Sequence, residues 1–134
     1  WEGYASGRNI PRFFRHWAKK KGRKIAYEPD DARIIFKKAH QGDTLTKQFL
    51  DDLAKLNARA ISNVIVAYDP ELIVLGGSVA LYNGRTLIKG IRRYIDRFLD
   101  PPPIHATSLG EDIALVGVSV AILGKNEIEM RNSV

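Results

Sequence analysis

The sequence contains no cysteine, and this absence excludes disulfide bonds and thiolate metal sites. Its three histidines, His16, His40 and His105, show no paired spacing of the H-x-x-x-H type, so we expect no metal site in the chain. No run of about 18 uninterrupted apolar residues occurs, and the first residues lack the charged-then-apolar order of a secretion signal. We therefore expect no membrane association and a cytoplasmic location.

Acidic residues are also absent from one long stretch, Gly3 to Tyr27. The chain of 134 residues has 21 Lys and Arg against 15 Asp and Glu, a formal net charge of +6. Eight of the 21 basic residues lie in this stretch, which leaves 13 basic against 15 acidic residues elsewhere. The positive charge is therefore local. The eight residues are Arg8, Arg12, Arg15, Lys19, Lys20, Lys21, Arg23 and Lys24.

Aromatic residues are interleaved with these basic residues, and the pattern allows two interpretations. A basic patch with exposed rings is typical of nucleic-acid-binding modules, where cations contact phosphates and rings stack on bases. Alternatively, Phe13, Phe14 and Trp17 fall at helical spacing and face the core, while the lysines keep the opposite face in water. We favour the second interpretation and expect no nucleic-acid partner.

Helical patterns dominate the first half of the chain. Residues 2–20 suit two helical pieces, because Pro11 favours the first turn of a second helix. Residues 29–31 then open a short helix that runs to Ala39. Asp43 is better explained as the cap of the longest helix, of about twenty residues, than as a catalytic acid. The apolar stripe of that helix is Leu45, Phe49, Leu53, Leu56, Ala60 and Val64.

Strand and helix patterns alternate in the second half. Asp69-Pro70 ends the long helix, and Leu72–Leu75 is a short apolar run typical of a strand buried on both faces. Residues 101–103, all proline, end the next helix, and a strand is expected at Ile104–Thr107. Ile113–Leu123 suits a strand or a packed helix. We therefore predict an α/β fold with helices on a short, mainly parallel sheet. The helix before the prolines has the stripe Leu87, Ile88, Ile91, Ile95 and Phe98.

Two glycines, Gly76 and Gly77, close the first predicted strand, and Ser78 follows them. Glycines there let a ligand approach the backbone and expose N–H groups to anions, although most such pairs are simple turns. The surrounding segment, residues 69–80, reads Asp-Pro-Glu, an aliphatic strand and Gly-Gly-Ser-Val. It resembles the second nucleotide-binding glycine segment of the ROK family of sugar kinases, which lies beside the adenosine part of ATP.

Other segments resemble the same family in order and spacing. Residues 2–7, Glu-Gly-Tyr-Ala-Ser-Gly, are similar to the family segment E-x-Y-A-S-G, which follows a cysteine-rich zinc loop. Residues 109–118 are similar to the closing helix of the family, with Val118 in place of the usual alanine. Residues 39–43, with Ala39, Gly42 and Asp43 just before the long helix, also fit the pattern of the family. The resemblance covers nearly the whole chain, and the glycine segment is its most specific part.

The resemblance implies that residues 1–134 form the C-terminal part of a ROK sugar kinase, within the larger domain of an actin-like ATPase, or ribonuclease H-like, fold. In that family a hexose and ATP bind between two domains, a catalytic aspartate removes a hydroxyl proton, and Mg²⁺ neutralises phosphate charge. That aspartate and the first phosphate-binding loop have no counterpart here. We therefore expect no catalytic residue in this chain and no activity from it alone. The ligands of a structural zinc would lie upstream of Trp1.

Site residues are carried over only where a motif matches. Glu2 corresponds to the glutamate that hydrogen-bonds sugar hydroxyls in the family, and a carboxylate suits that task. Gly76, Gly77 and Ser78 correspond to the nucleotide-binding segment. The full-length protein is then expected to be an ATP-dependent, glucokinase-like hexose kinase that forms a homodimer. ROK proteins also include sugar-responsive transcription repressors, and this sequence leaves that alternative open.

Overall fold

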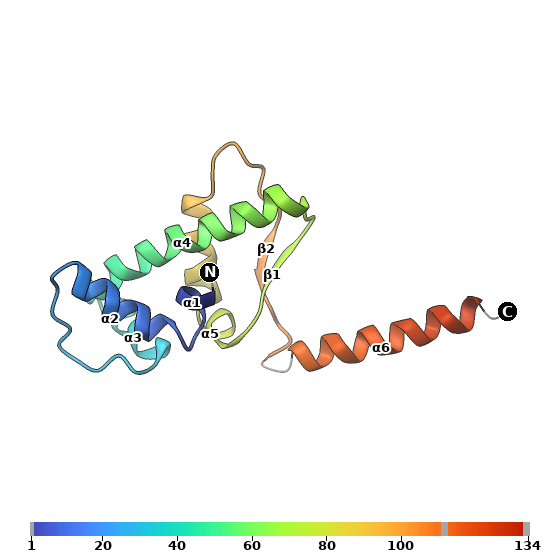
Figure 1. Cartoon of the computed structure of the whole chain (residues 1–134), viewed down its shortest axis with the longest axis horizontal. Helices are drawn as coiled ribbons and strands as arrows, with labels where there is room; N and C mark the ends of the chain where they lie inside the picture. Colours follow the sequence, from blue (N-terminus) through green and yellow to red (C-terminus); the bar gives the residue numbers. More distant parts are fainter. Residues whose placement is uncertain (1, 111–112, 133–134) are drawn as a thin grey trace.

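Six helices and two short strands form the described part of the chain, residues 2–110 and 113–132, in a computed structural model (Figure 1). Side chains are described for residues 3–110 and 114–123. The order of the elements agrees with the α/β prediction. They are α1 (Glu2–Ala5), α2 (Ile10–Lys20), α3 (Ala32–His40), α4 (Thr44–Tyr68), β1 (Ile73–Leu75), α5 (Ser78–Tyr94), β2 (Ile104–Ala106) and α6 (Ile113–Asn132).

The two strands form a parallel sheet in which Ile73 pairs with Ile104 and Leu75 with Ala106. α5 connects them, because parallel neighbours need a crossover. One face of the sheet packs against α4 and α5, and Ile73 and Ile104 are buried in that core. The prediction of a strand buried on both faces was wrong. Val74 points to the other face and is 49% exposed, since no described residue covers it.

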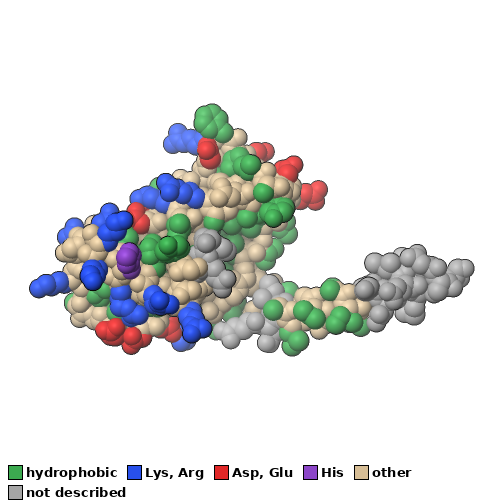
Figure 2. All heavy atoms as spheres, viewed as in Figure 1, with side chains coloured by type: hydrophobic (Ala, Val, Ile, Leu, Met, Phe, Trp, Pro, Cys, Tyr) green, Lys and Arg blue, Asp and Glu red, His purple; other side chains and the backbone are tan. Residues whose placement is uncertain are grey.

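A second core lies between α2, α3 and α4 and is rich in aromatic rings. Phe14 and Phe49 are fully buried with ring centroids 4.9 Å apart, and Trp17 packs edge-on to Phe49 at 5.6 Å. Phe13 is partly buried and lies 5.3 Å from Phe49. The interpretation of these rings as core residues is therefore confirmed. Lys and Arg side chains cover the outer surface at this end of the molecule (Figure 2).

Side-chain caps set where α3 and α4 begin. Asp43 accepts hydrogen bonds from the backbone N–H and the hydroxyl of Thr46, at 2.7 and 2.8 Å, which confirms its predicted role as a cap. Asp31 caps α3, so Pro29 precedes this helix instead of lying in its first turn. α4 is 25 residues long and ends at Asp69, which has a left-handed conformation with φ 43°.

The buried side of α4 departs from the predicted stripe in its second half. Phe49 and Leu53 are buried as predicted, but the next buried position is Asn57 instead of Leu56, and Val64 is 38% exposed. Asn57 is polar but faces the core, so a stripe traced through apolar residues alone passes over it. The predicted stripe therefore followed Leu56, on a neighbouring side of the helix. The buried positions are Thr46, Phe49, Leu53, Asn57, Ala58, Ile61 and Ile65.

The stripe predicted for α5 was wrong at its last residue. α5 ends at Tyr94, and the following Ile95 has φ −58° and ψ 140°. Asp96 then accepts a hydrogen bond from the backbone N–H of Phe98 at 3.0 Å, which closes a turn. Because the helix has already ended, Phe98 is 98% exposed instead of following Ile91 into the core.

α6 carries apolar residues on all its sides and extends away from the rest of the chain (Figure 1). Ile113–Leu123 is helical, yet every described side chain from Ala114 to Leu123 is exposed. Leu115 and Leu123, for example, are 68% and 64% exposed. A helix that is apolar all round is normally buried, so α6 requires a covering surface that the described residues do not provide. Among these residues no helix has the length and apolar character needed to cross a membrane.

α5 lies very close to β2 and to α4 at two glycines. A Cβ atom on Gly84 would lie 2.5 Å from the Cβ of Ala106, and one on Gly90 would lie 2.8 Å from the Cβ of Ala54. Non-bonded carbon atoms prefer separations of about 3.5–4.0 Å, so a larger residue at either position would displace its neighbour. The two contacts therefore fix α5 against the sheet and against the long helix.

The substitution Gly84→Ala should destabilise the protein by about 1–3 kcal/mol, because the added methyl group forces β2 away from α5. The double variant Gly84→Ala/Ala106→Gly should recover part of this loss, since it removes the opposing methyl group. Gly117→Ala in α6 is a matched control, because a Cβ there meets nothing within 4 Å. Urea unfolding followed by circular dichroism measures all three. An unchanged midpoint for Gly84→Ala would contradict the close contact.

Candidate functional site

The carboxyl end of β1 leads through Gly76 and Gly77 directly into α5. Gly77 has φ 89° and ψ 166°, a conformation essentially restricted to glycine, and it forms the N-cap of α5. Its carbonyl accepts a hydrogen bond from the N–H of Leu81 at 2.9 Å. The N–H groups of residues 78–80 have no partner within the helix, and no acidic residue lies in its first turn. This helix end is therefore a positively polarised set of donors.

The segment Ala5–Gly7 packs against the start of α5. A Cβ on Gly7 would lie 3.1 Å from Cγ2 of Val79 and 3.4 Å from Oγ of Ser78. The fold thus joins two motifs from opposite halves of the sequence, and together they line a cavity of about 270 Å³. Its lining residues are Ala5, Ser6, Gly7, Gly76, Gly77, Ser78 and Val79.

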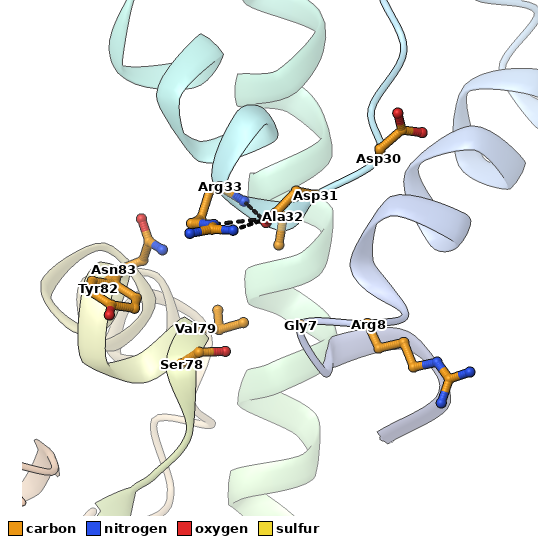
Figure 3. A pocket seen from close by; sticks show the side chains of 10 residues that line it. All are labelled: Gly7, Arg8, Asp30, Asp31, Ala32, Arg33, Ser78, Val79, Tyr82 and Asn83. Atoms are coloured by element: carbon orange, nitrogen blue, oxygen red, sulfur yellow. Dashed lines mark hydrogen bonds and ion pairs between the residues drawn. The ribbon is translucent and has the colours of Figure 1, made fainter. Parts of the chain in front are cut away.

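A larger cavity of about 400 Å³ adjoins the first and shares Gly7, Ser78 and Val79 with it. Its other walls come from the start of α3 and from the second turn of α5 (Figure 3). We name the two cavities together the α3–α5 cleft. The larger one is lined by Gly7, Arg8, Asp30, Asp31, Ala32, Arg33, Ser78, Val79, Tyr82 and Asn83.

A fixed ion pair lies on the α3 side of the cleft. Asp31 accepts hydrogen bonds from Nε and from the backbone N–H of Arg33, both at 2.8 Å, and Nη2 of Arg33 lies 2.6 Å from its Oδ2. These hydrogen bonds from Arg33 hold the pKa of Asp31 below its ordinary value. Arg33 lies on the side of the cleft that faces Tyr82 and Asn83, whereas Arg8 points away from it (Figure 3).

The cleft offers two different kinds of groups to a ligand. At the start of α5, glycines and N–H donors suit the close approach of an anion. On the α3 side, the guanidinium of Arg33 and the exposed ring of Tyr82 are planar groups that suit stacking on an aromatic base. The arrangement therefore fits an elongated ligand with an anionic group at one end and a ring system at the other.

The structure brings the predicted nucleotide-binding residues, 76–78, into the wall of the cleft. The side chain of Glu2 lies outside the described residues, so its sugar contact stays a prediction. Arg33 and Tyr82 were not predicted. Tyr82 lies four residues after Ser78, and helical spacing would have placed both on one side of α5. Within the described part of the chain, no three His, Cys, Asp or Glu side chains gather closely enough to hold a metal ion.

Comparison with known proteins establishes the family. The ROK family profile matches residues 1–125, so the chain belongs to the ROK family. A glucokinase from Pyrobaculum calidifontis is 32% identical over 123 residues, which cover 88% of this chain and 38% of that protein. An N-acetyl-D-glucosamine kinase from Haemophilus influenzae is 29% identical over 126 residues, which cover 92% of this chain and 39% of that protein.

A solved structure shares the fold. The ROK family glucokinase from Streptomyces griseus, in complex with glucose and AMPPNP, matches with a TM-score of 0.68 and 24% identity, over 87% of this chain and 42% of its own. This likeness confirms the predicted actin-like ATPase fold. The chain spans about two fifths of the length of these relatives, so the activity of a complete relative belongs to a larger protein than this chain.

Proposed function

We propose that the chain is part of an ATP-dependent, glucokinase-like sugar kinase and that the α3–α5 cleft binds ATP. The geometry at the start of α5 carries this proposal, because Gly77 and the unpaired helical N–H groups suit a phosphate. The adjoining cavity of about 400 Å³ has room and planar groups for a base. The glucokinase and the N-acetyl-D-glucosamine kinase among the relatives support the same class of activity.

In this proposal the adenosine of ATP lies along residues 76–78, as the family resemblance implies, with its base toward Arg33 and Tyr82 and its nearest phosphate at the N–H groups that begin α5. The backbone contributes more than the hydroxyl of Ser78, because several N–H groups converge at the helix end. Mg²⁺ bound with the nucleotide would neutralise phosphate charge. The zinc ligands that the family resemblance implies belong to the part of the ROK fold that this chain does not span. Such a kinase works in the cytoplasm, where its ATP is supplied.

Phosphoryl transfer to a sugar also needs a base that removes the hydroxyl proton. The carboxylates that line the cleft are Asp30 and Asp31, and Asp31 is already held by Arg33 as the cap of α3. We therefore place the base, an aspartate, in the part of the ROK fold that this chain does not span. Glu2 would bind sugar hydroxyls, and we propose glucose as the sugar.

Gly77→Ala should weaken the binding of AMPPNP by at least about tenfold, because a side chain strains this backbone conformation and crowds the phosphate. Gly42→Ala is the matched control. Gly42 has a similar φ of 99°, a Cβ there meets nothing within 4 Å, and it lies outside the cleft. Calorimetric titration at a temperature where both variants are folded separates binding from stability. Equal affinities for the two variants would argue against a nucleotide at Gly77.

The purified 134-residue chain should phosphorylate glucose at no more than the background rate, even when it binds AMPPNP, because the proposed base lies outside it. A coupled assay for ADP release measures the rate. Turnover that rises in proportion to the concentration of the chain would show that the base lies within these residues. AMPPNP binding without turnover is the expected combination.

The exposed face of the sheet supports the proposal of a homodimer. Phe49 and Leu53 of the long helix are buried in the core, so they are not available for a contact between copies. Val74 in β1 and Leu72 just before it are 49% and 52% exposed, and no described strand pairs with the outer edges of the two-stranded sheet. Such an apolar face and unpaired edge favour association with a second copy.

Light scattering at micromolar concentration should report a dimer, and Val74→Lys should shift it toward the monomer, because a charge on this face opposes contact between copies. Leu109→Lys is the control, since Leu109 is 55% exposed and lies outside the sheet. A monomeric parent chain would refute the proposal. A dimer that Val74→Lys leaves intact would place the contact elsewhere.

A further inference from the structure

A separate cavity of about 500 Å³ lies between α2 and α4 and shares no residue with the α3–α5 cleft. One wall comes from the end of α2 and the turn that follows it, and the other from the first three turns of α4. We name it the α2–α4 cavity. It is lined by Trp17, Lys21, Arg23, Lys47, Gln48, Asp51, Asp52 and Lys55.

Three of the four cations in this cavity are available to a ligand. Lys55 is neutralised, because its Nζ lies 2.9 Å from Oδ1 of Asp52 and 3.0 Å from Oδ2 of Asp51. Within the described residues, no ion pair forms at Lys21, Arg23 or Lys47. Lys21, Arg23 and Lys47 are exposed and line one cavity, and cations that form no ion pair suit a doubly charged phosphate group, although the charge of Lys21 also acts on Asp52.

The two carboxylates of the cavity are held rigidly by side chains from three helices. Asp52 accepts a hydrogen bond from the indole N–H of Trp17 at 2.9 Å, and Trp17 is only 8% exposed. Asp51 accepts one from the hydroxyl of Tyr94 at 2.6 Å. Hydrogen bonds from Tyr94 to Asp51, and from Lys55 and Trp17 to Asp52, keep the pKa of each carboxyl below its ordinary value. Both carboxylates are therefore ionised acceptors at neutral pH, with lone pairs left for sugar hydroxyls.

We propose that the α2–α4 cavity binds a small phosphorylated sugar, with its phosphate on Lys21, Arg23 and Lys47 and its hydroxyls toward Asp51 and Asp52. The cations of the lining suit a phosphate and its carboxylates suit hydroxyl groups, and this combination supports a sugar phosphate as the ligand. The proposal does not rest on the kinase function of the α3–α5 cleft. A continuous polyanion fits less well. Two fixed carboxylates would repel it, and Trp17 and Phe14 are in the core, so their rings cannot stack on bases.

Calorimetric titration of the chain with glucose 6-phosphate, inorganic phosphate and glucose tests the proposal, in about 0.1 M salt to suppress non-specific attraction. We expect glucose 6-phosphate to bind at least about tenfold more tightly than either of the other two, because only it engages both the cations and the carboxylates. Lys21→Gln/Lys47→Gln should weaken that binding by about tenfold or more. Lys37→Gln/Lys89→Gln, which removes the same charge at exposed positions outside the cavity, should change it less than about twofold.

Three results would overturn the proposal. Inorganic phosphate that binds as tightly as glucose 6-phosphate would reduce the cavity to an anion site without sugar recognition. If both double variants lost the same amount of affinity for glucose 6-phosphate, the binding would be a general effect of charge and not a property of the cavity. Duplex DNA that binds at physiological salt, and is lost in Lys21→Gln/Lys47→Gln alone, would assign the cations to nucleic acid. Gly77→Ala should leave the binding of glucose 6-phosphate unchanged, and this distinguishes the site from the ATP cleft.

Discussion

The close packing of α5 is the constraint on which the rest of the structure depends. Gly84 lets α5 approach β2, and Gly90 lets it approach α4, so the part of α5 that follows the kink at Asn83 is fixed from two directions. The first turn, which precedes the kink, packs against Gly7 through Ser78 and Val79, and there the N–H donors open into the cleft. Backbone donors can bind a ligand well only if their direction is set in advance, because their orientation then costs nothing at the moment of binding.

α4 connects the two cores and forms one wall of the α2–α4 cavity. Its first half contributes Phe49 and Leu53 to the aromatic core, and its second half contributes Ile61 and Ile65 to the core of the sheet. The exposed side of the first half carries Asp51, Asp52 and Lys55, which form part of the α2–α4 cavity. A rigid helix of 25 residues therefore holds a polar cavity on one side while its opposite side packs the interior.

Local chemistry explains what could be predicted from the sequence. Asp43 caps α4 through its own neighbour Thr46, and Gly76-Gly77 ends a strand, so each pattern lies within a few residues. Phe98 was wrongly predicted to face the core, because a turn ends the helix before it. Asn57 was not predicted to be buried, because apolar periodicity does not mark a polar residue as part of the core. Arg33 could not be predicted as part of the cleft, since only the packing of α3 beside α5 brings it there.

The uncovered helix α6 has a consequence for the lifetime of the protein in a cell. Its exposed leucine, isoleucine and valine side chains form the kind of apolar segment that chaperones and proteases bind when a protein is incompletely folded. Burial of α6 would remove this segment from chaperones and proteases, so we expect a molecule with α6 covered to last longer than one with α6 uncovered.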